Sequence, residues 1–168
     1  PMSRRPSLLA QSRRSSGEVQ AARSRAPVPV CWNASARIGR ALASDQHPFV
    51  LADSADAPSS GAPGDSTVVL EQLIAAQPQH RCLHNIVDSD AVAAMVAAGP
   101  GAQITIALGA SSGVPFYQPI SVTGRVRGLF DGDFTNKGQG FQGVVFSCGR
   151  TAVLEIGAIA LVVMERPV

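Results

Sequence analysis

The residues best suited to chemistry surround a loop of small residues at positions 54–64. Aspartates stand on both sides of this loop, and a helix with apolar residues at helical spacing follows it. The first turn of a helix leaves backbone N–H groups unpaired at the positive end of the helix dipole, where a carboxylate or a phosphate can bind. The aspartates could instead take a divalent cation. The candidate residues for binding a substrate or an anion are Asp56, Gly61, Gly64, Asp65, Ser66 and Thr67.

A structural role is the alternative for the same loop. Asp65 or Ser66 could cap the helix, and the glycines could let the chain turn. The loop has neither the Gly-Lys-Ser/Thr of a Walker loop nor the GxGxxG of a dinucleotide-binding turn. The pattern therefore leaves both a ligand site and a plain turn open.

A second group with ligand chemistry is the row His80, Cys82 and His84. On a strand these three side chains leave one face, and histidine and cysteine are zinc ligands. Ligands from adjacent positions of one strand rarely converge on a tetrahedral metal, however, and Cys82 also fits as a small buried hydrophobe. We therefore predict no metal site within this chain.

Other catalytic patterns are missing from the sequence. It has no HExxH motif and no paired carboxylates at diagnostic spacing, so the catalytic residues remain unassigned. All three histidines lie at or before His84, which leaves the C-terminal half without a base that titrates near neutral pH. The glycine-rich stretch Asp133–Gly143 could cover a ligand, and a plain hairpin loop explains it equally well.

Periodicity predicts the elements that hold these residues. A short helix is expected over Ala34–Ala43. The elements that follow are a buried strand over Phe49–Ala52, a helix that starts at Val68 and stops before Pro78, a strand over Arg81–Val87, a helix over Ala91–Ala98 with Asp88-Ser89-Asp90 as its N-terminal signal, and a strand over Gln103–Leu108. Strands that alternate with helices over short connections are typical of a parallel sheet. The predicted fold class is α/β, built on a small three-layer βαβαβ unit.

The second half of the sequence predicts an antiparallel β meander, added to the βαβαβ unit. A long strand is expected over Ile120–Phe130, with Val122, Val126 and Phe130 pointing inward. Gly124 and Gly128 interrupt that row and indicate a bulge or bend. Three further strands are expected over Gly143–Ser147, Thr151–Ile156 and Ala158–Met164.

The basic residues are unevenly distributed. Residues 1–30 hold six arginines against one acid, a charge of +5, whereas the remaining residues hold eight basic and eleven acidic groups, a charge of −3. We interpret residues 1–35 as a basic, disordered tail and residues 36–168 as the folded domain. An RNA-binding arm or a transit peptide are the alternatives for the tail. No aromatic residue interleaves the arginines before residue 30, so nucleic acid is not the expected partner.

Cysteine use and hydropathy bear on location. The three cysteines are widely spaced and form no CxxC, which favours free thiols in a reducing compartment. No apolar run reaches the roughly 20 residues of a membrane span. We therefore expect a cytoplasmic protein without a membrane partner.

Three motifs in order carry a family resemblance. The segments LADSADAPSSGAPGDSTVVLEQL, GDFTNKGQGFQG and GRTAVLEIGAIALVVMERPV resemble the C-terminal domain of the microcystinase C proteins, M81-type metallopeptidase homologues associated with microcystin degradation. The resemblance covers residues 36–168. The family pattern in the first motif is Ala-Asp-Asn-Pro-Gly-Gly-Gly-Ala-Pro-Gly-Asp-Ser-Thr, and this chain departs from it at Ala57, Ser59 and Ser60.

The resemblance implies a role for the chain within a larger enzyme. Family members resemble zinc-dependent hydrolases whose metal ligands are expected in a large N-terminal domain. The chain would then line a substrate cleft for a peptide or small molecule, with a catalytic N-terminal domain or subunit as its partner, and would not bind the zinc by itself. The alternative is a stand-alone binding or interaction domain without an enzymatic role.

Overall fold

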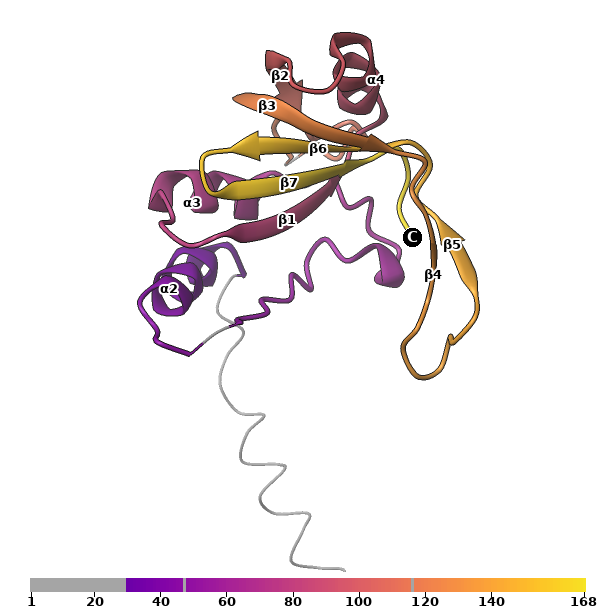
Figure 1. Ribbon diagram of the computed structural model, residues 1–168. Coiled ribbons are helices and arrows are strands. Elements are labelled where there is room, and N and C mark those ends of the chain that lie inside the picture. Colours follow the sequence, from indigo (N-terminus) through magenta and orange to yellow (C-terminus); the bar gives the residue numbers. More distant parts are fainter. Residues whose placement is uncertain (1–29, 47, 116) are drawn as a thin grey trace, which may run out of the picture.

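The computed structural model describes residues 30–46, 48–115 and 117–168 (Figure 1). Its helices are α2 (Val30–Leu42), the short 3-10 helix η2 (Pro58–Ser60), α3 (Val68–Ala76) and α4 (Ser89–Ala98). Its strands are β1 (Cys82–Val87), β2 (Gln103–Leu108), β3 (Ile120–Phe130), β4 (Asp133–Thr135), β5 (Val145–Ser147), β6 (Thr151–Ile156) and β7 (Ile159–Met164). The α/β class and the antiparallel meander are therefore confirmed.

The main sheet is mixed rather than parallel. Its strand order is β1-β7-β6-β3-β2, with β1 parallel to β7 and every other neighbouring pair antiparallel. The predicted parallel βαβαβ unit is wrong because β7, from the end of the chain, takes the place beside β1. Strands β1 and β2 consequently lie at opposite edges of the sheet.

The strand predicted over Phe49–Ala52 is also wrong. This segment has no regular secondary structure, and Phe49, Val50 and Leu51 are 47%, 88% and 48% exposed. An apolar run predicts burial, but it does not say which edge of a sheet is available to pair with it. β1 therefore remains an edge strand, and at its end the Val87 N–H donates to the carbonyl oxygen of Gly64 at 2.8 Å.

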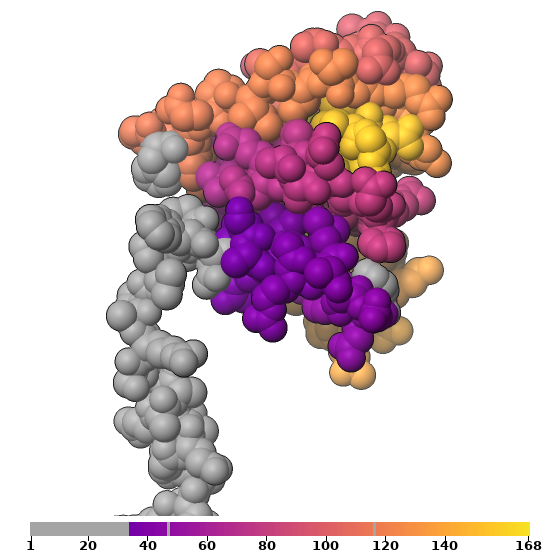
Figure 2. All heavy atoms as spheres, turned by 90° about the vertical axis from the view of Figure 1, so that its left-hand side faces the viewer, coloured from indigo at the N-terminus to yellow at the C-terminus, as the bar shows by residue number. Residues whose placement is uncertain are grey.

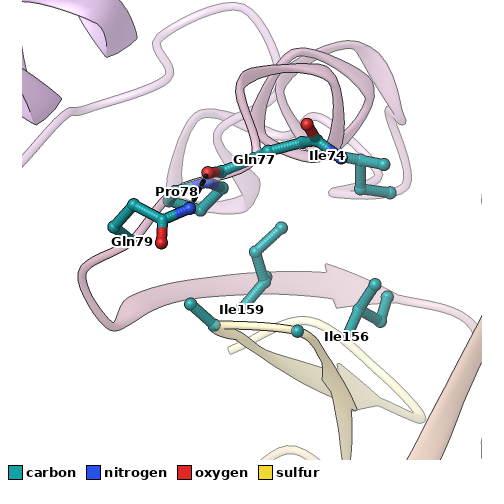
Figure 3. A pocket seen from close by; sticks show the side chains of 8 residues that line it. Ile74, Gln77, Pro78, Gln79, Ile156 and Ile159 are labelled. Atoms are coloured by element: carbon teal, nitrogen blue, oxygen red, sulfur yellow. Dashed lines mark hydrogen bonds between the residues drawn. The ribbon is translucent and has the colours of Figure 1, made fainter.

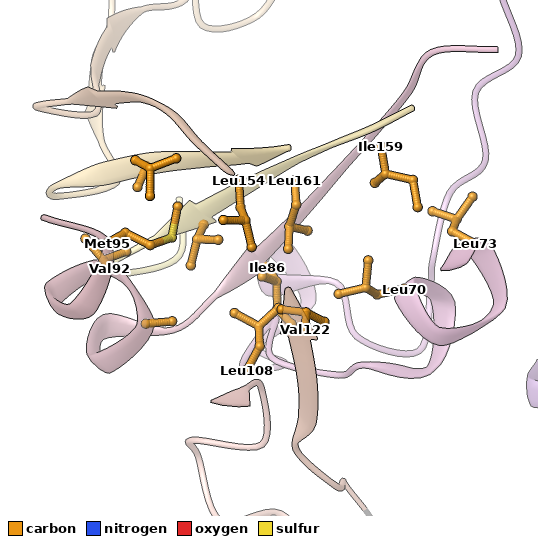
Figure 4. Close-up of a cluster of buried hydrophobic side chains, with 14 of the residues drawn as sticks. Leu70, Leu73, Ile86, Val92, Met95, Leu108, Val122, Leu154, Ile159 and Leu161 are labelled. Carbon is orange, nitrogen blue, oxygen red and sulfur yellow. The ribbon is translucent and has the colours of Figure 1, made fainter. Parts of the chain in front are cut away.

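The helices that pack on the sheet cover one face of it (Figure 4). Leu70 of α3 and Val92 of α4 are fully buried in one hydrophobic cluster together with Leu154 and Leu161 of the sheet. The other face carries exposed polar side chains, among them Thr123 and Arg125 of β3. The arrangement has helices on one side of the sheet instead of the three layers predicted.

The three predicted helices are confirmed as α2, α3 and α4. α2 starts four residues earlier than expected and buries Ile38 against the core cluster, so the tail boundary placed at residue 36 falls inside this helix. Residues 1–29, with the arginines discussed above, lie outside the described residues. α4 begins after Asp88, whose side chain accepts a hydrogen bond from the Ala91 N–H at 2.9 Å, so the N-terminal signal expected at Asp88-Ser89-Asp90 is confirmed and Asp88 is the residue that caps the helix.

Strand β3 contains the predicted irregularity. Its register with β6 shifts between Val126 and Gly128, so Arg127 is an extra residue. The shift reverses the alternation beyond it, and Phe130 is 59% exposed rather than inward as predicted, while Leu129 packs against the core. Before the bulge, a Cβ at Gly124 would lie 2.7 Å from the carbonyl oxygen of Glu155, so the strands approach closely there.

The sheet curls enough for the residues directly after its two edge strands to make contact. The N–H of Gly109, directly after β2, donates to Asp88, directly after β1, at 2.8 Å. The end of β2 also lies beside the loop that precedes α3, where a Cβ at Gly109 would clash with Thr67 Cγ2 and with the Asp65 carbonyl oxygen. The curl therefore assembles the candidate site from segments that the sheet order alone would separate.

The stretch Asp133–Gly143 forms part of a separate hairpin. β4, which was not predicted, pairs with β5 in a two-stranded sheet that projects from the main sheet (Figure 1). Phe134 and Phe146 stack with ring centroids 5.7 Å apart. No helix among the described residues is long and apolar enough to cross a membrane.

Candidate functional site

Asp56 is the anchor of the candidate loop. Its Oδ1 accepts a hydrogen bond from the Gly64 N–H at 2.9 Å, and its Oδ2 accepts one from the Ser66 N–H at 2.7 Å. These are amides near the start of α3, where an external anion was predicted to bind. The carboxylate of Asp56 already takes the place of that anion, since hydrogen bonds between a carboxylate and backbone amides are strong.

Gly64 is required by both conformation and space. It has φ +77°, and a Cβ on it would lie 2.8 Å from Pro58 Cγ and 3.1 Å from Val87 Cγ2. Its carbonyl joins the loop to β1, as described above. Gly61 also has a positive φ, +87°, but it ends the exposed η2 turn and has open space around its Cα. The two predicted glycines therefore have different roles, a close contact at Gly64 and a turn at Gly61.

Asp65 is buried, with 1% exposure, and does not cap α3. Its Oδ2 accepts a hydrogen bond from the Ser112 N–H at 2.6 Å, and its carbonyl oxygen accepts one from the Ala110 N–H at 2.9 Å. Its Oδ1 has no hydrogen-bond partner among the described residues. Asp65 thus ties the loop to the segment after β2 and keeps one buried carboxylate oxygen unpaired.

Ser66 and Thr67 complete the start of the helix. The N-cap residue is Thr67, which makes no side-chain cap bond; its buried hydroxyl donates instead to the Gln118 carbonyl at 2.8 Å. Ser66 Oγ accepts a long hydrogen bond from the Val68 N–H at 3.4 Å. The hydroxyl of Thr67 therefore fixes the loop after β2, whereas that of Ser66 is only weakly engaged.

A pocket of about 520 Å³ lies between α2, the loop and the free edge of β1. In Figure 2, α2 (indigo) covers the lower part of this side of the molecule, with the magenta part of the chain that includes α3 directly above it. The polar lining residues are Arg37, Asp53, Ser54, Asp56, Ser66, His84 and Asn85. Of the six predicted site residues, Asp56, Gly64 and Ser66 line this pocket; Asp65 and Thr67 are buried beside it, and Gly61 is exposed on the loop.

His84 was considered for a metal but lies in this pocket. Its Nε2 is buried and has no hydrogen-bond partner in the part of the chain that the structure describes. Burial lowers the pKa of His84 below its ordinary value of 6.5, although the charges of Asp53 and Asp56 act in the opposite direction. The imidazole is consequently neutral at pH 7.

The predicted His–Cys–His row does not form one site. His80 precedes β1, and Cys82 packs against the hydrophobic core, where burial raises the pKa of its thiol. Within residues 30–46, 48–115 and 117–168 no group of three or more His, Cys, Asp or Glu side chains is placed to hold a metal ion. The donor set therefore does not fit a zinc ion in this part of the molecule.

Tyr117 is a site residue that the sequence analysis missed. Its hydroxyl donates to Asp56 Oδ1 at 3.2 Å. Burial, followed by the negative charge and hydrogen bond of Asp56 and the charges of Asp65 and Asp53, raises the pKa of Tyr117. The one signal available in the sequence was that this is its single tyrosine, in a connection after a predicted strand.

A second pocket of about 460 Å³ lies at the opposite end of α3 (Figure 3). Ile74, Ile156 and Ile159 line it together with Gln77, Pro78, Gln79, Gly157 and Ala158. None of these side chains titrates or attacks as a nucleophile. Of these two pockets in the described part of the chain, the one beside β1 is therefore the one with titratable lining side chains.

Comparisons with known proteins identify the stretch that holds the candidate loop and β1. Residues 51–168 match the family described as "MlrC C-terminus". The chain is 29% identical over 131 residues to Microcystinase C from Sphingomonas sp., an alignment that covers 78% of this chain and 25% of that protein.

One solved structure shares the fold. The crystal structure of a candidate metallopeptidase from Mesorhizobium sp. BNC1 superimposes with a TM-score of 0.69 at 23% sequence identity, over 79% of this chain and 26% of that one. The chain thus spans about a quarter of the length of both proteins. At this identity the likeness concerns the fold alone.

Proposed function

The chain belongs to the MlrC C-terminus family, and on that premise we propose that it forms one wall of the substrate cleft of a metallopeptidase-like hydrolase. The wall is the loop Asp56–Thr67 together with the pocket beside β1. The observation that carries the proposal is that this loop lies inside the family match and is fixed in place by part-buried hydrogen bonds beside a pocket. Loops held by a rigid scaffold are where binding residues concentrate.

The metal belongs to another part of the enzyme under this proposal. The relatives named above are metallopeptidase-like, the family resemblance implies zinc, and the ion would activate water when bound. Because the described side chains do not fit a zinc ion, we place its ligands in a catalytic N-terminal domain or subunit. The proposed role of this chain is to bind and orient a peptide substrate.

Three groups in the pocket can contact such a substrate. Asp53 uses Oδ1 to accept the Ala55 N–H at 2.9 Å, and its Oδ2 has no hydrogen bond among the described residues. The Ser66 hydroxyl is weakly engaged, and the neutral imidazole of His84 presents an unpaired Nε2. Together they offer acceptors and one hydroxyl to the polar groups of a peptide.

The test uses a full-length family member. Substitutions equivalent to Asp53→Asn and Ser66→Ala should lower kcat/KM for peptide hydrolysis by about tenfold each, because each removes one hydrogen bond to the substrate. Ser121→Ala, on the outer face of β3, is the matched control and should leave kcat/KM unchanged. Unchanged hydrolysis in both pocket variants, with unchanged zinc content, would contradict the proposal.

The chain by itself gives a second test. Peptide hydrolysis and zinc content are measured for the chain alone and for the chain mixed with the N-terminal domain of a relative. We expect activity only in the mixture. Stoichiometric zinc and turnover by the chain alone would contradict the proposal that the catalytic metal site lies in an N-terminal domain or subunit.

A stand-alone binding domain is the second candidate. The observation in its favour is the departure of Ala57, Ser59 and Ser60 from the family pattern, in the turn where the Ser60 N–H bonds to the Ala57 carbonyl. This candidate predicts no hydrolysis in the mixture either, and none after Ala57→Asn, Ser59→Gly and Ser60→Gly are combined. Activity gained by that triple variant would favour the hydrolase.

A further inference from the structure

We infer that the pocket beside β1 binds a primary ammonium group attached to an apolar body, the chemistry of a peptide N-terminus or an amino acid amide. The inference extends the proposed function, because it names the substrate class of the same site. It rests on the sign of the charge around the pocket and on two acceptors that lack donors.

The sequence led us to expect an anion at the start of α3. The carboxylates of the loop that precedes α3 instead make this region suited to a cation. Asp56 occupies the amides of Gly64 and Ser66, so an incoming anion finds these donors engaged. The ionised lining residues are two carboxylates, Asp53 and Asp56, and one guanidinium, Arg37, which is exposed. Buried Asp65, between two lining residues, adds a third carboxylate. With neutral His84 the balance is negative and favours a cation.

The pocket also contains acceptors without donors. His84 lines the pocket, its buried Nε2 has no partner among the described residues, and a neutral imidazole with its proton on Nδ1 can accept a hydrogen bond at Nε2. Asp53 Oδ2 makes no hydrogen bond among the described residues. A primary ammonium carries three donors and can pair with Asp53 Oδ2, and with His84 Nε2 once the atoms that cover this nitrogen shift. A buried acceptor left unpaired costs free energy, which such a ligand recovers.

The cation is organic rather than metallic. The described side chains hold no cluster of three metal-ligating groups, and both oxygens of Asp56 are already engaged. Ile38, Leu51 and Val69 line the same pocket and offer apolar surface to the body of the ligand. A volume of about 520 Å³ is in the range of sites for small organic ligands.

The probe is L-leucinamide, with N-acetyl-L-leucinamide as its uncharged counterpart, titrated into the whole chain and followed by two-dimensional amide NMR. We expect leucinamide to bind at millimolar concentration and to shift the resonances of Ser54, Ser66, His84 and Asn85. The acetylated probe should bind at least about tenfold more weakly, because acetylation removes a charge-assisted hydrogen bond.

Two variants locate the ammonium group. Asp53→Asn should weaken leucinamide binding about tenfold, whereas Asp90→Asn, the same change of charge in the first turn of α4, should not alter it. His84→Leu should weaken binding without unfolding the chain. Equal affinity for the two probes, binding that is insensitive to Asp53→Asn, or no binding of leucinamide would each overturn the inference.

The two proposals can fail separately. If leucinamide does not bind but the pocket variants of a full-length relative still lose hydrolysis, the proposed substrate cleft is supported and the inferred ammonium site is wrong. If leucinamide binds as expected but those variants hydrolyse normally, the pocket takes an ammonium group and the proposed role in hydrolysis falls.

Discussion

The loop Asp56–Thr67 and the hairpin formed by β4 and β5 both contain glycines and polar residues, and both belong to motifs that carry the family resemblance. Side chains of the loop bond to segments far along the chain, such as Tyr117 and Ser112. Hydrogen bonds at the tip of the hairpin join near neighbours, as between Asn136 and Gly138. The difference indicates that the loop is held in place by the hydrogen bonds of the half-buried Asp56 and the buried Asp65, whereas glycine content is common to both regions.

Removing the anchor of the loop should have the largest effect on this contrast. Asp56→Ala leaves the amides of Gly64 and Ser66 without their acceptor and should lower the free energy of unfolding by about 3 kcal/mol. The control is Asp131→Ala, which removes one 3.2 Å bond to the Asp133 N–H in an exposed turn. Urea unfolding of both variants measures the difference; equal losses would remove the distinction between the two regions.

Adding a methyl group to one glycine in each region should give the next largest effect. Gly64→Ala and Gly143→Ala both place a side chain at positive φ, which costs about 1 kcal/mol. Only the first also brings a Cβ to within 2.8 Å of a neighbouring atom, so it should destabilise by about 1 kcal/mol more. The Tm of both variants is measured by thermal unfolding. An identical decrease in Tm would show that the loop rearranges around the added Cβ of Gly64→Ala without cost.

His84→Leu should act on stability in the opposite direction from the two loop substitutions. It removes a buried nitrogen that has no partner and should raise the free energy of unfolding by about 1 kcal/mol, while weakening leucinamide binding. If His84 had a structural role, His84→Leu would lower the free energy of unfolding instead.

The same variant should change how stability depends on pH. Because burial lowers the pKa of folded His84 below 6.5, the unfolded chain takes up a proton that the folded chain does not as the pH falls below 6.5. Stability of the unsubstituted protein therefore declines on acidification through that window. Urea unfolding of both proteins at pH 7 and pH 5 should show a smaller decline in His84→Leu; parallel declines would contradict the assignment.

The smallest effect is expected in the hairpin. Phe141 is exposed and meets Phe146 edge-on with ring centroids 6.0 Å apart. Phe141→Ser should change the free energy of unfolding by less than about 1 kcal/mol, because an exposed aromatic contact contributes little. Leucinamide binding should be unaltered. A loss of binding in this variant would couple the hairpin to the pocket.

Local sequence patterns predicted the elements that depend on local contacts. Strands β2 and β6 have the predicted bounds, because alternation and flanking turns define them, and Asp88 caps α4 through its own neighbours. The order of the strands could not be predicted in this way. Nothing in Phe49–Ala52 or in Ile159–Met164 indicates that β7, rather than the earlier segment, pairs with β1.

Only the part of the candidate site that depends on local sequence could be predicted. Asp56, Gly64 and Ser66 were identified from the loop and line the pocket. The carboxylate of Asp56 accepts hydrogen bonds from backbone amides eight and ten residues further along the chain. These bonds depend on the conformation of the loop, which the spacing of residues in the sequence does not reveal. The approach of Tyr117 and His84 to this loop depends on the curl of the sheet and the position of its edge.

The open edge of β1 has a consequence for solvent exchange along one strand. Because the Cys82 N–H bonds to the Ala158 carbonyl on the β7 side, the N–H groups of His84 and Ile86 also point toward β7, and those of Leu83 and Asn85 point away from it. In D₂O, protection should therefore alternate residue by residue and return at Val87, whose N–H the Gly64 carbonyl holds. The loop thus closes one end of the edge and leaves too short a row of free amides for a foreign strand to extend the sheet.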